Sequence, residues 1–260
     1  MRENRVRQIW AASGTVLNGW CAIPSGFSAE LMAQLGWDSI VIDAQHGLVG
    51  YGDMVAMLQG ISTTAVTPLV RVPWNDPAEI MKALDAGAYG IICPMINSRA
   101  ECQAFVGACR YAPKGYRSSG PVRAALYGGA DYTAKANETI VAMAMIETRE
   151  ALGALDAIMS TPDLDAVYVG PSDLSVTLGL PHGLDRSEDV VLRALADILA
   201  ACRRHHIKAG IHTGSAAYAK RMVEMGFDFV TLMSDARFLT LAGSEIAREM
   251  RAAIAAQKKT

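Results

Sequence analysis

Short hydrophobic runs alternate with amphipathic stretches along almost the whole chain. The runs are rich in β-branched residues and have the length of buried strands, whereas the stretches between them repeat their apolar residues at helical spacing. The predicted strands are residues 16–23, 39–43, 67–70, 90–93, 141–146, 166–169, 209–211 and 229–232. Because a strand–helix alternation is typical of parallel sheets, the pattern predicts an α/β protein.

The stretches between the strands predict the covering helices. They are residues 28–35, 53–59, 77–86, 98–110, 148–161 and 187–205, followed by a long Ala-rich helix from residue 235 to about residue 256. Asp76 and Ser98 are predicted N-caps, and Pro77 suits a first helical position. Residues 111–138, rich in Gly and Arg, interrupt the alternation, and connections of that length are usually functional, interfacial or disordered.

Eight alternations favour a closed (β/α)8 TIM barrel, with a doubly wound open sheet as the alternative. No G-x-G-x-x-G motif follows the first predicted strand, which disfavours a dinucleotide-binding sheet. The length of 260 residues suits one barrel, so residues 1–260 are predicted to form a single domain with a short N-terminal helix and a long C-terminal one.

Composition excludes several classes of function. With a net charge of -2 the chain has no basic field for nucleic acid. Five cysteines without a C-x-x-C pair indicate reduced thiols, as in cytosolic proteins. The sequence contains neither a signal-peptide pattern nor an apolar stretch long enough to cross a membrane. A cytoplasmic protein is predicted.

Four polar residues follow predicted strands, where barrel enzymes carry their chemistry. They are His46 after the second strand, Arg71 after the third, Glu147 after the fifth and Asp173 after the sixth. Each has a structural alternative: Asp173 suits a helix N-cap, Glu147 a first helical turn, and the two cationic types often serve only packing or ion pairs. Their coincidence at one end of the barrel favours a catalytic site.

The two carboxylates predict a site for a hard divalent ion such as Mg²⁺, Mn²⁺ or Co²⁺. Such an ion would act as a Lewis acid on a 2-oxo acid and stabilise its enolate, with Arg71 supporting the negative charge and His46 moving the proton. No lysine ends a predicted strand and no G-x-S-x-G occurs, which disfavours imine and serine chemistry. His212, which ends the seventh strand, either contacts an aldehyde or is structural.

Several segments together carry a family resemblance. They are Ile42-Asp-Ala-Gln-His-Gly47, Val70-Arg-Val-Pro73, Ala83-Leu-Asp-Ala-Gly87 with Pro94-Met95, Met145-Ile-Glu-Thr-Arg-Glu150 and Gly170-Pro-Ser-Asp-Leu-Ser175. In this order, from about Gly19 to Ala242, the chain resembles the HpcH/HpaI aldolases, which are metal-dependent (class II) pyruvate aldolases.

The resemblance implies roles for individual residues. Glu147 and Asp173 would be the metal ligands, His46 the base and Arg71 the group that stabilises the enolate. Asp85 would raise the basicity of His46, and the backbone around Ser172 and Asp173 would hold the pyruvate carboxylate. The family also implies a homohexamer in which the C-terminal helix packs on, or is swapped with, a neighbouring subunit.

Two positions depart from the family pattern: Gln45 stands where Glu is expected, and Met145 where Gln is expected. Because a Met cannot donate the hydrogen bond that Gln would make to an oxo acid, these substrate contacts are expected to differ. The predicted activity is reversible cleavage of a 4-hydroxy-2-oxo acid into pyruvate, or another 2-oxo acid, and an aldehyde from aromatic breakdown or a sugar acid. The alternatives are a CoA-ester lyase of the same superfamily and a non-catalytic barrel that binds an oxo acid.

Overall fold

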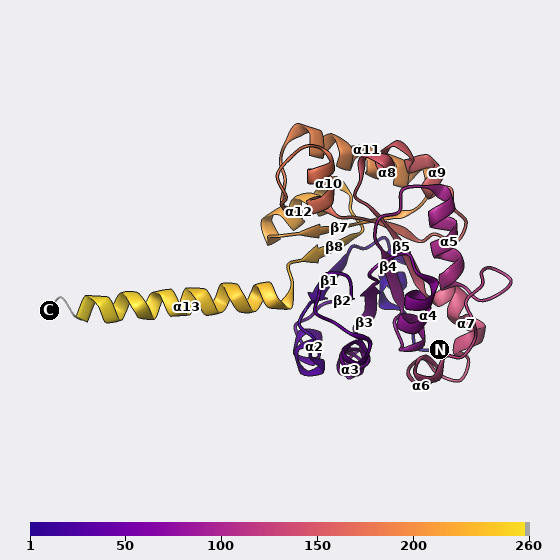
Figure 1. Ribbon diagram of the computed structural model, residues 1–260, viewed down its shortest axis with the longest axis horizontal. Coiled ribbons are helices and arrows are strands. Elements are labelled where there is room, and N and C mark those ends of the chain that lie inside the picture. Colours follow the sequence, from indigo (N-terminus) through magenta and orange to yellow (C-terminus); the bar gives the residue numbers. More distant parts are fainter. Residues whose placement is uncertain (258–260) are drawn as a thin grey trace.

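The computed structural model describes residues 1–257 and contains a closed barrel of parallel strands (Figure 1). The strands are β1 (Val16–Cys21), β2 (Ser39–Asp43), β3 (Thr67–Arg71), β4 (Gly90–Cys93), β5 (Val141–Ile146), β6 (Ala166–Val169), β7 (Lys208–Thr213) and β8 (Phe229–Leu232). They neighbour one another in chain order, and β1 pairs with β8 to close the barrel. The predicted barrel is confirmed, and the open sheet is excluded.

The strands are buried on both faces, which explains their continuous hydrophobic runs. All residues of β5, for example, are buried. One apolar cluster lies between the strands and the helices, and a second fills the barrel interior with side chains such as Trp20, Leu69, Met143 and Phe229. The barrel is therefore a packed core, and a site can form only at one of its ends.

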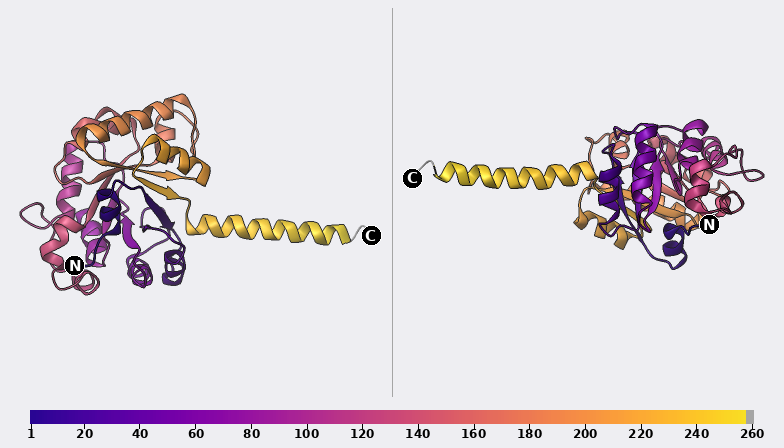
Figure 2. Two further views of the ribbon diagram at one scale, coloured as in Figure 1. Left: turned by 180° about the vertical axis from the view of Figure 1, so that it is seen from behind. Right: turned by 90° about the horizontal axis from the view of Figure 1, so that it is seen from below.

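Helices precede, separate and follow the strands, and most of them cover the outside of the barrel (Figures 1 and 2). They are α1 (Arg5–Ala11), α2 (Gly26–Ala33), α3 (Tyr51–Ile61), α4 (Pro77–Asp85), α5 (Arg99–Cys109), α6 (Val122–Gly128), α7 (Tyr132–Thr139), α8 (Arg149–Gly153), α9 (Leu155–Met159), α10 (Pro171–Thr177), α11 (Asp189–His205), α12 (Ala216–Met225) and α13 (Asp235–Gln257). Asp76 and Ser98 accept N-cap hydrogen bonds from Ala78 and Glu101, as predicted.

The single helix predicted for residues 148–161 is wrong. Ala154 leaves the helical conformation, with φ −118° and ψ 15°, and separates α8 from α9. Gly153 precedes this break, and glycine is a poor helix former because it loses the most backbone freedom. The interrupting segment 111–138 is not irregular throughout, because it contains α6 and all but the last residue of α7.

The N-terminal segment covers the end of the barrel where the strands begin. The Trp10 indole donates to the carbonyl of Asp228, directly before β8, at 3.0 Å. Arg7 donates to Asp165, directly before β6, at 2.7 Å. The opposite end of the barrel, where the strands finish, is therefore the end at which a site can form.

The last helix, α13, leaves the barrel and extends away from it in every view (Figures 1 and 2). Its start is held in place, because Asp235 accepts hydrogen bonds from the backbone of Ala22 (2.8 Å) and from Ser28 Oγ (3.1 Å). Phe238 also stacks on Trp37, with ring centroids 6.1 Å apart. The long helix is confirmed, while its exchange between subunits stays a prediction.

Candidate active site

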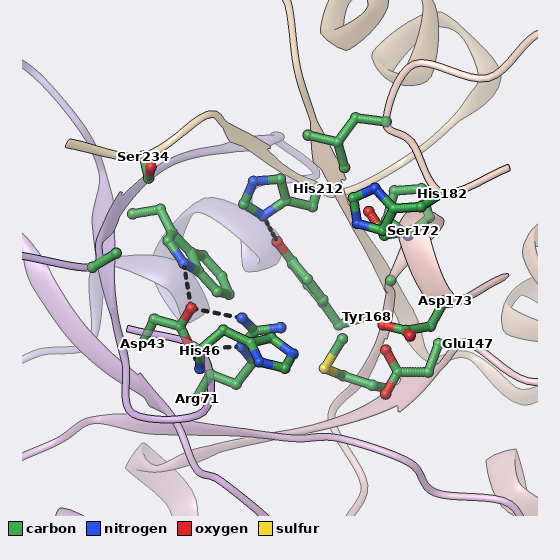
Figure 3. A pocket seen from close by; sticks show the side chains of 16 residues that line it. Asp43, His46, Arg71, Glu147, Tyr168, Ser172, Asp173, His182, His212 and Ser234 are labelled. Carbon is green, nitrogen blue, oxygen red and sulfur yellow. Dashed lines mark hydrogen bonds and ion pairs between the residues drawn. The ribbon is translucent and has the colours of Figure 1, made fainter. Parts of the chain in front are cut away.

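A cavity of about 570 Å³ opens where the strands end, and Figure 3 shows the side chains that line it. All the sequence-predicted site residues contribute to its wall except Asp85 and Gln45. Its lining residues are Trp20, Ala22, Asp43, His46, Arg71, Met145, Glu147, Tyr168, Gly170, Pro171, Ser172, Asp173, His182, Leu184, His212 and Ser234. Side chains from most of the strands therefore converge on one space.

On the β2–β3 side of the cavity, a two-point ion pair joins Asp43 and Arg71. Arg71 Nε donates to Asp43 Oδ1 at 2.9 Å, and Arg71 Nη2 donates to Asp43 Oδ2 at 2.6 Å. The Trp20 indole N–H adds a third bond to Asp43 at 3.2 Å. Burial opposes ionisation of Asp43, but the hydrogen bonds and the charge of Arg71 outweigh it and hold the pKa of this carboxyl below its ordinary value.

This ion pair fixes the Arg71 guanidinium through two of its three nitrogens and leaves the third as a possible donor to a ligand. Within residues 1–257, Arg71 Nη1 has no hydrogen-bond or ion-pair partner. The guanidinium also lies 4.8 Å from the Trp20 ring, which supports one of its faces. A permanently charged donor is therefore held ready beside the cavity.

His46 sits in a tight loop that Asp43 organises. The backbone N–H groups of Gln45 and His46 donate to Asp43 Oδ1, at 3.1 and 3.2 Å. The loop needs Gly47, because a Cβ there would lie 2.2 Å from the Asp43 carbonyl oxygen. The imidazole is exposed and lies beside Arg71 (Figure 3), where it can meet a ligand directly.

On the β5–β6 side, two carboxylates lie next to each other (Figure 3). Glu147 is only 2% exposed, and its Oε1 accepts the backbone N–H of Met95 at 2.8 Å. Burial raises the pKa of Glu147 to about 7, and the charge of Asp173 adds to the rise. Gly170 makes room for this group, since a Cβ at Gly170 would lie 2.3 Å from Glu147 Oε2.

The two carboxylates fit a divalent ion of the hard class. Glu147 and Asp173 would offer two carboxylate ligands, and no cluster of three or more His, Cys, Asp or Glu that could hold a metal occurs among the described residues. Water and substrate oxygens would complete the shell, as is usual for Mg²⁺. A cation here would also offset the repulsion between two adjacent acids, one of them buried.

Ser172 and Asp173 belong to the first turn of α10, whose N-cap is Gly170. Asp173 is therefore not the N-cap itself, which was its structural alternative. The N–H groups of a first turn have no partner inside the helix, so they are free to meet a ligand oxygen. Met145, which ends in a thioether, lines the same wall and offers no hydrogen-bond donor.

His212 projects from β7 between two aromatic side chains. Its Nδ1 lies 3.2 Å from the Tyr168 hydroxyl, and its ring meets the edge of Trp20 at a centroid distance of 4.9 Å. Burial, helped by the charge of Arg71, lowers the pKa of His212 to about 4. The imidazole is therefore neutral near pH 7 and can both donate and accept a hydrogen bond.

Two predicted residues lie outside the cavity. Asp85 ends α4 at the end of the barrel where strands begin, and it pairs with Arg117 at 2.6 Å. One chain therefore does not bring Asp85 to His46. Gln45 precedes His46, but its side-chain oxygen is buried and has no hydrogen-bond partner among the described residues.

Sequence reasoning missed several residues of the wall. Asp43 ends a buried strand, as Ile146 does just before Glu147, so the strand-end rule could have found it. Trp20 and Tyr168 have the pattern of core residues, and nothing in the sequence sets them apart. His182 is exposed, as expected of a surface residue, yet the loop that carries it borders the cavity.

Comparisons with known proteins identify the family of the chain. Residues 20–240 match the family described as HpcH/HpaI aldolase/citrate lyase. The hydroxypyruvate/pyruvate aldolase of Rhizorhabdus wittichii is 42% identical over 96% of this chain and 99% of its own length. The 4-hydroxy-2-oxo-heptane-1,7-dioate aldolase of Klebsiella pneumoniae is 34% identical over 88% of this chain and 86% of its own length.

The fold has solved counterparts. A crystal structure of an HpcH/HpaI aldolase/citrate lyase family protein from Burkholderia cenocepacia superposes with a TM-score of 0.88 and 29% identity, covering 95% of this chain and 99% of that one. The match to the family spans most of the sequence and includes the end of β1 and all of β2 to β8. The chain therefore belongs to the HpcH/HpaI aldolase/citrate lyase family, and it is an enzyme of the aldolase class of lyases.

Proposed function

We propose that this enzyme reversibly cleaves a 4-hydroxy-2-oxo acid into pyruvate and an aldehyde, using Glu147, Asp173, Arg71 and His46. The observation that carries the proposal is the arrangement of the cavity, in which an adjacent pair of carboxylates faces a fixed guanidinium and an exposed imidazole. Aldol chemistry needs these groups together, because negative charge develops on one oxygen while a proton leaves another.

Glu147 and Asp173 would hold a divalent ion, Mg²⁺, Mn²⁺ or Co²⁺, for which their donor set is equally suitable. When bound, the ion would supply Lewis acidity to the oxygens of the oxo acid. The Met95 N–H keeps Glu147 oriented, and Gly170 keeps space beside it. The protein therefore provides the ligands in a preformed position.

In the cleavage direction, His46 would accept the proton of the C4 hydroxyl. The C4 oxygen then forms the carbonyl of the aldehyde, the C3–C4 bond breaks, and its electron pair becomes that of the pyruvate enolate. Arg71 Nη1 would donate to the oxygen on which the negative charge collects, while Asp43 and Trp20 hold the guanidinium still. Protonation of the enolate at C3 completes pyruvate.

We propose pyruvate as the donor, with hydroxypyruvate as a second donor. The name of the Rhizorhabdus wittichii relative contains both oxo acids. The N–H groups at the start of α10 would take the carboxylate of the donor. Met145 would contact the donor only through its thioether, so it would give no hydrogen bond to the bound oxo acid.

We further propose a homo-oligomer, a hexamer by family likeness, in which each single-domain barrel receives α13 of a neighbour. The exposed part of α13 carries apolar side chains that its own barrel leaves uncovered: Leu239, Leu241, Ile246, Met250 and Ile254. An apolar groove over β8, β1 and α12 is equally uncovered; it is lined chiefly by Leu17, Trp37, Ala219, Val223 and Val230. Large complementary apolar surfaces of this kind mark protein interfaces.

The oligomer has a direct test. Val223→Asp in the groove or Ile246→Asp on α13 should lower the mass measured by light scattering, whereas Arg221→Asp, outside the groove, should not. An unchanged mass for both apolar variants would sink the exchange of α13. Asp85 could influence His46 only across such an interface, because within one chain it is occupied by Arg117.

No helix among residues 1–257 is long and apolar enough to cross a membrane, and the cytoplasmic location stays a prediction. The activity itself is tested by incubating the purified protein with pyruvate, Mg²⁺ or Mn²⁺ and a panel of aldehydes, with mass spectrometry of the products. A 4-hydroxy-2-oxo acid should form with the unchanged protein and not with Glu147→Gln. If no aldehyde gives a product with any of the ions, the proposal fails.

A further inference from the structure

A hydrogen-bonded chain of polar side chains crosses the apolar interior of the barrel. Ser39 Oγ on β2 donates to Asn18 Oδ1 on β1 at 2.8 Å, and Asn18 Nδ2 donates to Thr231 Oγ1 on β8 at 2.9 Å. The Tyr168 hydroxyl on β6 donates to the same Thr231 oxygen at 2.8 Å. All of these residues are at most 1% exposed. Buried polar groups are costly unless they are paired, and the members of this chain pair with one another.

The chain ends at His212, on the wall of the active-site cavity (Figure 3). The Tyr168 oxygen lies 3.2 Å from His212 Nδ1. A phenol has a single proton, and the proton of Tyr168 is used in the bond to Thr231. At the contact with His212 the phenol oxygen can therefore only accept a hydrogen bond, so Nδ1 is the nitrogen that donates.

The proton on Nδ1 decides the character of the other ring nitrogen. Because burial and the charge of Arg71 lower the pKa of His212 to about 4, the ring carries only one proton near pH 7. Nε2 is then an acceptor, and nothing within residues 1–257 donates to it. The edge of Trp20, at a centroid distance of 4.9 Å, supports the ring in this orientation.

The proton donor of the reaction lies elsewhere on the cavity wall. Figure 3 shows His46 together with Arg71, apart from His212. In the condensation direction His46 would return a proton to the aldehyde oxygen, the reverse of its role in cleavage. That oxygen is repelled by the lone pair on His212 Nε2, so it should turn towards His46 while the carbon chain of the aldehyde passes His212. One face of the aldehyde carbonyl is then presented to the enolate.

We propose that the chain from Ser39 to Tyr168 controls the stereochemistry at C4 by holding His212 as a hydrogen-bond acceptor. This role presupposes the proposed aldolase function. His212 is the residue that meets the aldehyde. Thr231, Asn18 and Ser39 are buried away from the ligand and act through Tyr168 and His212, so they are positioning residues.

The first test needs no substrate. NMR of protein labelled with ¹⁵N in the histidine rings distinguishes the two neutral tautomers, and the signal missing from His212→Gln identifies His212. The unchanged protein should carry the proton on Nδ1 at pH 7. In Thr231→Val the Tyr168 proton loses its acceptor and turns to His212 Nδ1, so the ring proton should move to Nε2. A ring proton on Nε2 in the unchanged protein would refute the proposal.

The second test measures the two enantiomers that pyruvate and propanal form at C4, separated by chiral chromatography. The unchanged protein should form one of them in excess. Thr231→Val should bring the ratio closer to one, by up to about fivefold, the factor that one hydrogen bond of ordinary net strength contributes. Tyr168→Phe, which leaves His212 Nδ1 without its partner, should act in the same direction. Thr231→Ser keeps the oxygen and should retain both the tautomer and the ratio.

Thr67→Val is the matched control. Thr67 is a buried threonine of β3 outside the chain, and its oxygen accepts the backbone N–H of Arg5 at 3.0 Å. Both valine variants should lose stability in urea, but only Thr231→Val should change the tautomer and the enantiomer ratio.

The outcomes separate this role from the activity itself. Equal enantiomers from the unchanged protein, or a ratio that Thr231→Val leaves as it is, would overturn the stereochemical role while the aldolase function stands. Failure to condense propanal while pyruvate protons still exchange would overturn it as well. Loss of both condensation and pyruvate proton exchange in the unchanged protein would instead reject the function on which the role depends.

Discussion

The two sides of the active-site cavity treat their charges in opposite ways. On the β2–β3 side, Asp43 is 3% exposed but satisfied by Arg71, Trp20 and two backbone N–H groups. On the β5–β6 side, Glu147 is equally buried, has one backbone donor and lies beside a second carboxylate. The first arrangement is complete within the protein, whereas the second gains most from a bound cation.

This contrast indicates that one side of the cavity has a structural role and the other side a chemical role. A buried ion pair with all its hydrogen bonds keeps the surrounding structure in place, and removing one partner leaves the other charge buried and unpaired. Two adjacent carboxylates without a cation lower the stability of the fold. Their presence is therefore explained by the ligand that they bind. The β2–β3 side therefore positions Arg71 and His46, and the β5–β6 side offers ligands.

The largest effect is expected where the complete side is broken. Arg71→Ala should lose about 3–5 kcal/mol of folding free energy, because Asp43 would be left buried and unpaired. It should also lower kcat by about 10²–10³-fold, through loss of an oxyanion donor. Urea unfolding and steady-state kinetics measure the two losses.

A double variant sharpens this prediction. Asp43→Leu combined with Arg71→Met replaces the pair by apolar side chains, so it should recover most of the stability but none of the activity. If Arg71→Ala alone had unchanged turnover, Arg71 would have no part in the reaction.

Glu147→Gln on the other side should separate activity from stability. The amide keeps an oxygen for the Met95 N–H but removes the negative charge. Loss of a residue that only supports a metal ligand costs up to about 10²-fold in activity, so loss of the ligand charge itself should lower turnover by at least that factor. In metal-free protein the unfolding midpoint in urea should be unchanged or higher, because the repulsion with Asp173 is gone. A marked loss of stability would contradict the contrast between the two sides.

A smaller effect is expected from His212, which lies between the two sides. Its pKa is about 4 in the folded protein, below the ordinary histidine value of 6.5, so the unfolded chain binds more protons between these values. Stability should therefore fall as the pH is lowered from 7 to 5, by about 2 kcal/mol from this group. His212→Gln should remove that part of the pH dependence, as measured by urea unfolding at both pH values. Equal slopes for the two proteins would mean that His212 is not held neutral.

The barrel could be predicted because its hydrophobic pattern carries the information. Strands buried on two faces give continuous apolar runs, and β2, β4, β5, β6 and β8 have the predicted bounds. The break at Ala154 could not, since an amphipathic spacing persists through α8 and α9. The direction of α13 could not be predicted either. An apolar stripe has the same helical spacing whether the helix packs on its own barrel or on the barrel of a neighbouring subunit.

The site was predictable where chemistry follows a strand end. Glu147, Asp173, Arg71 and His46 were placed on one cavity by that rule. Asp43, the last residue of β2, falls under the same rule, but its pairing with Arg71 joins two different strands and cannot be read from a local pattern. The pairing of Asp85 with Arg117 depends on residues 32 positions apart on different elements, which local patterns do not encode.

The central claim is that this cavity forms a pyruvate enolate with the help of a divalent ion. The most direct measurement is exchange of the pyruvate methyl protons in D₂O, followed by NMR, on metal-stripped protein with and without added Mg²⁺ or Mn²⁺. It needs no knowledge of the aldehyde. The account predicts exchange that appears only on addition of the ion and is lost in Glu147→Gln. Full exchange in the stripped protein, or none with any ion, would contradict it.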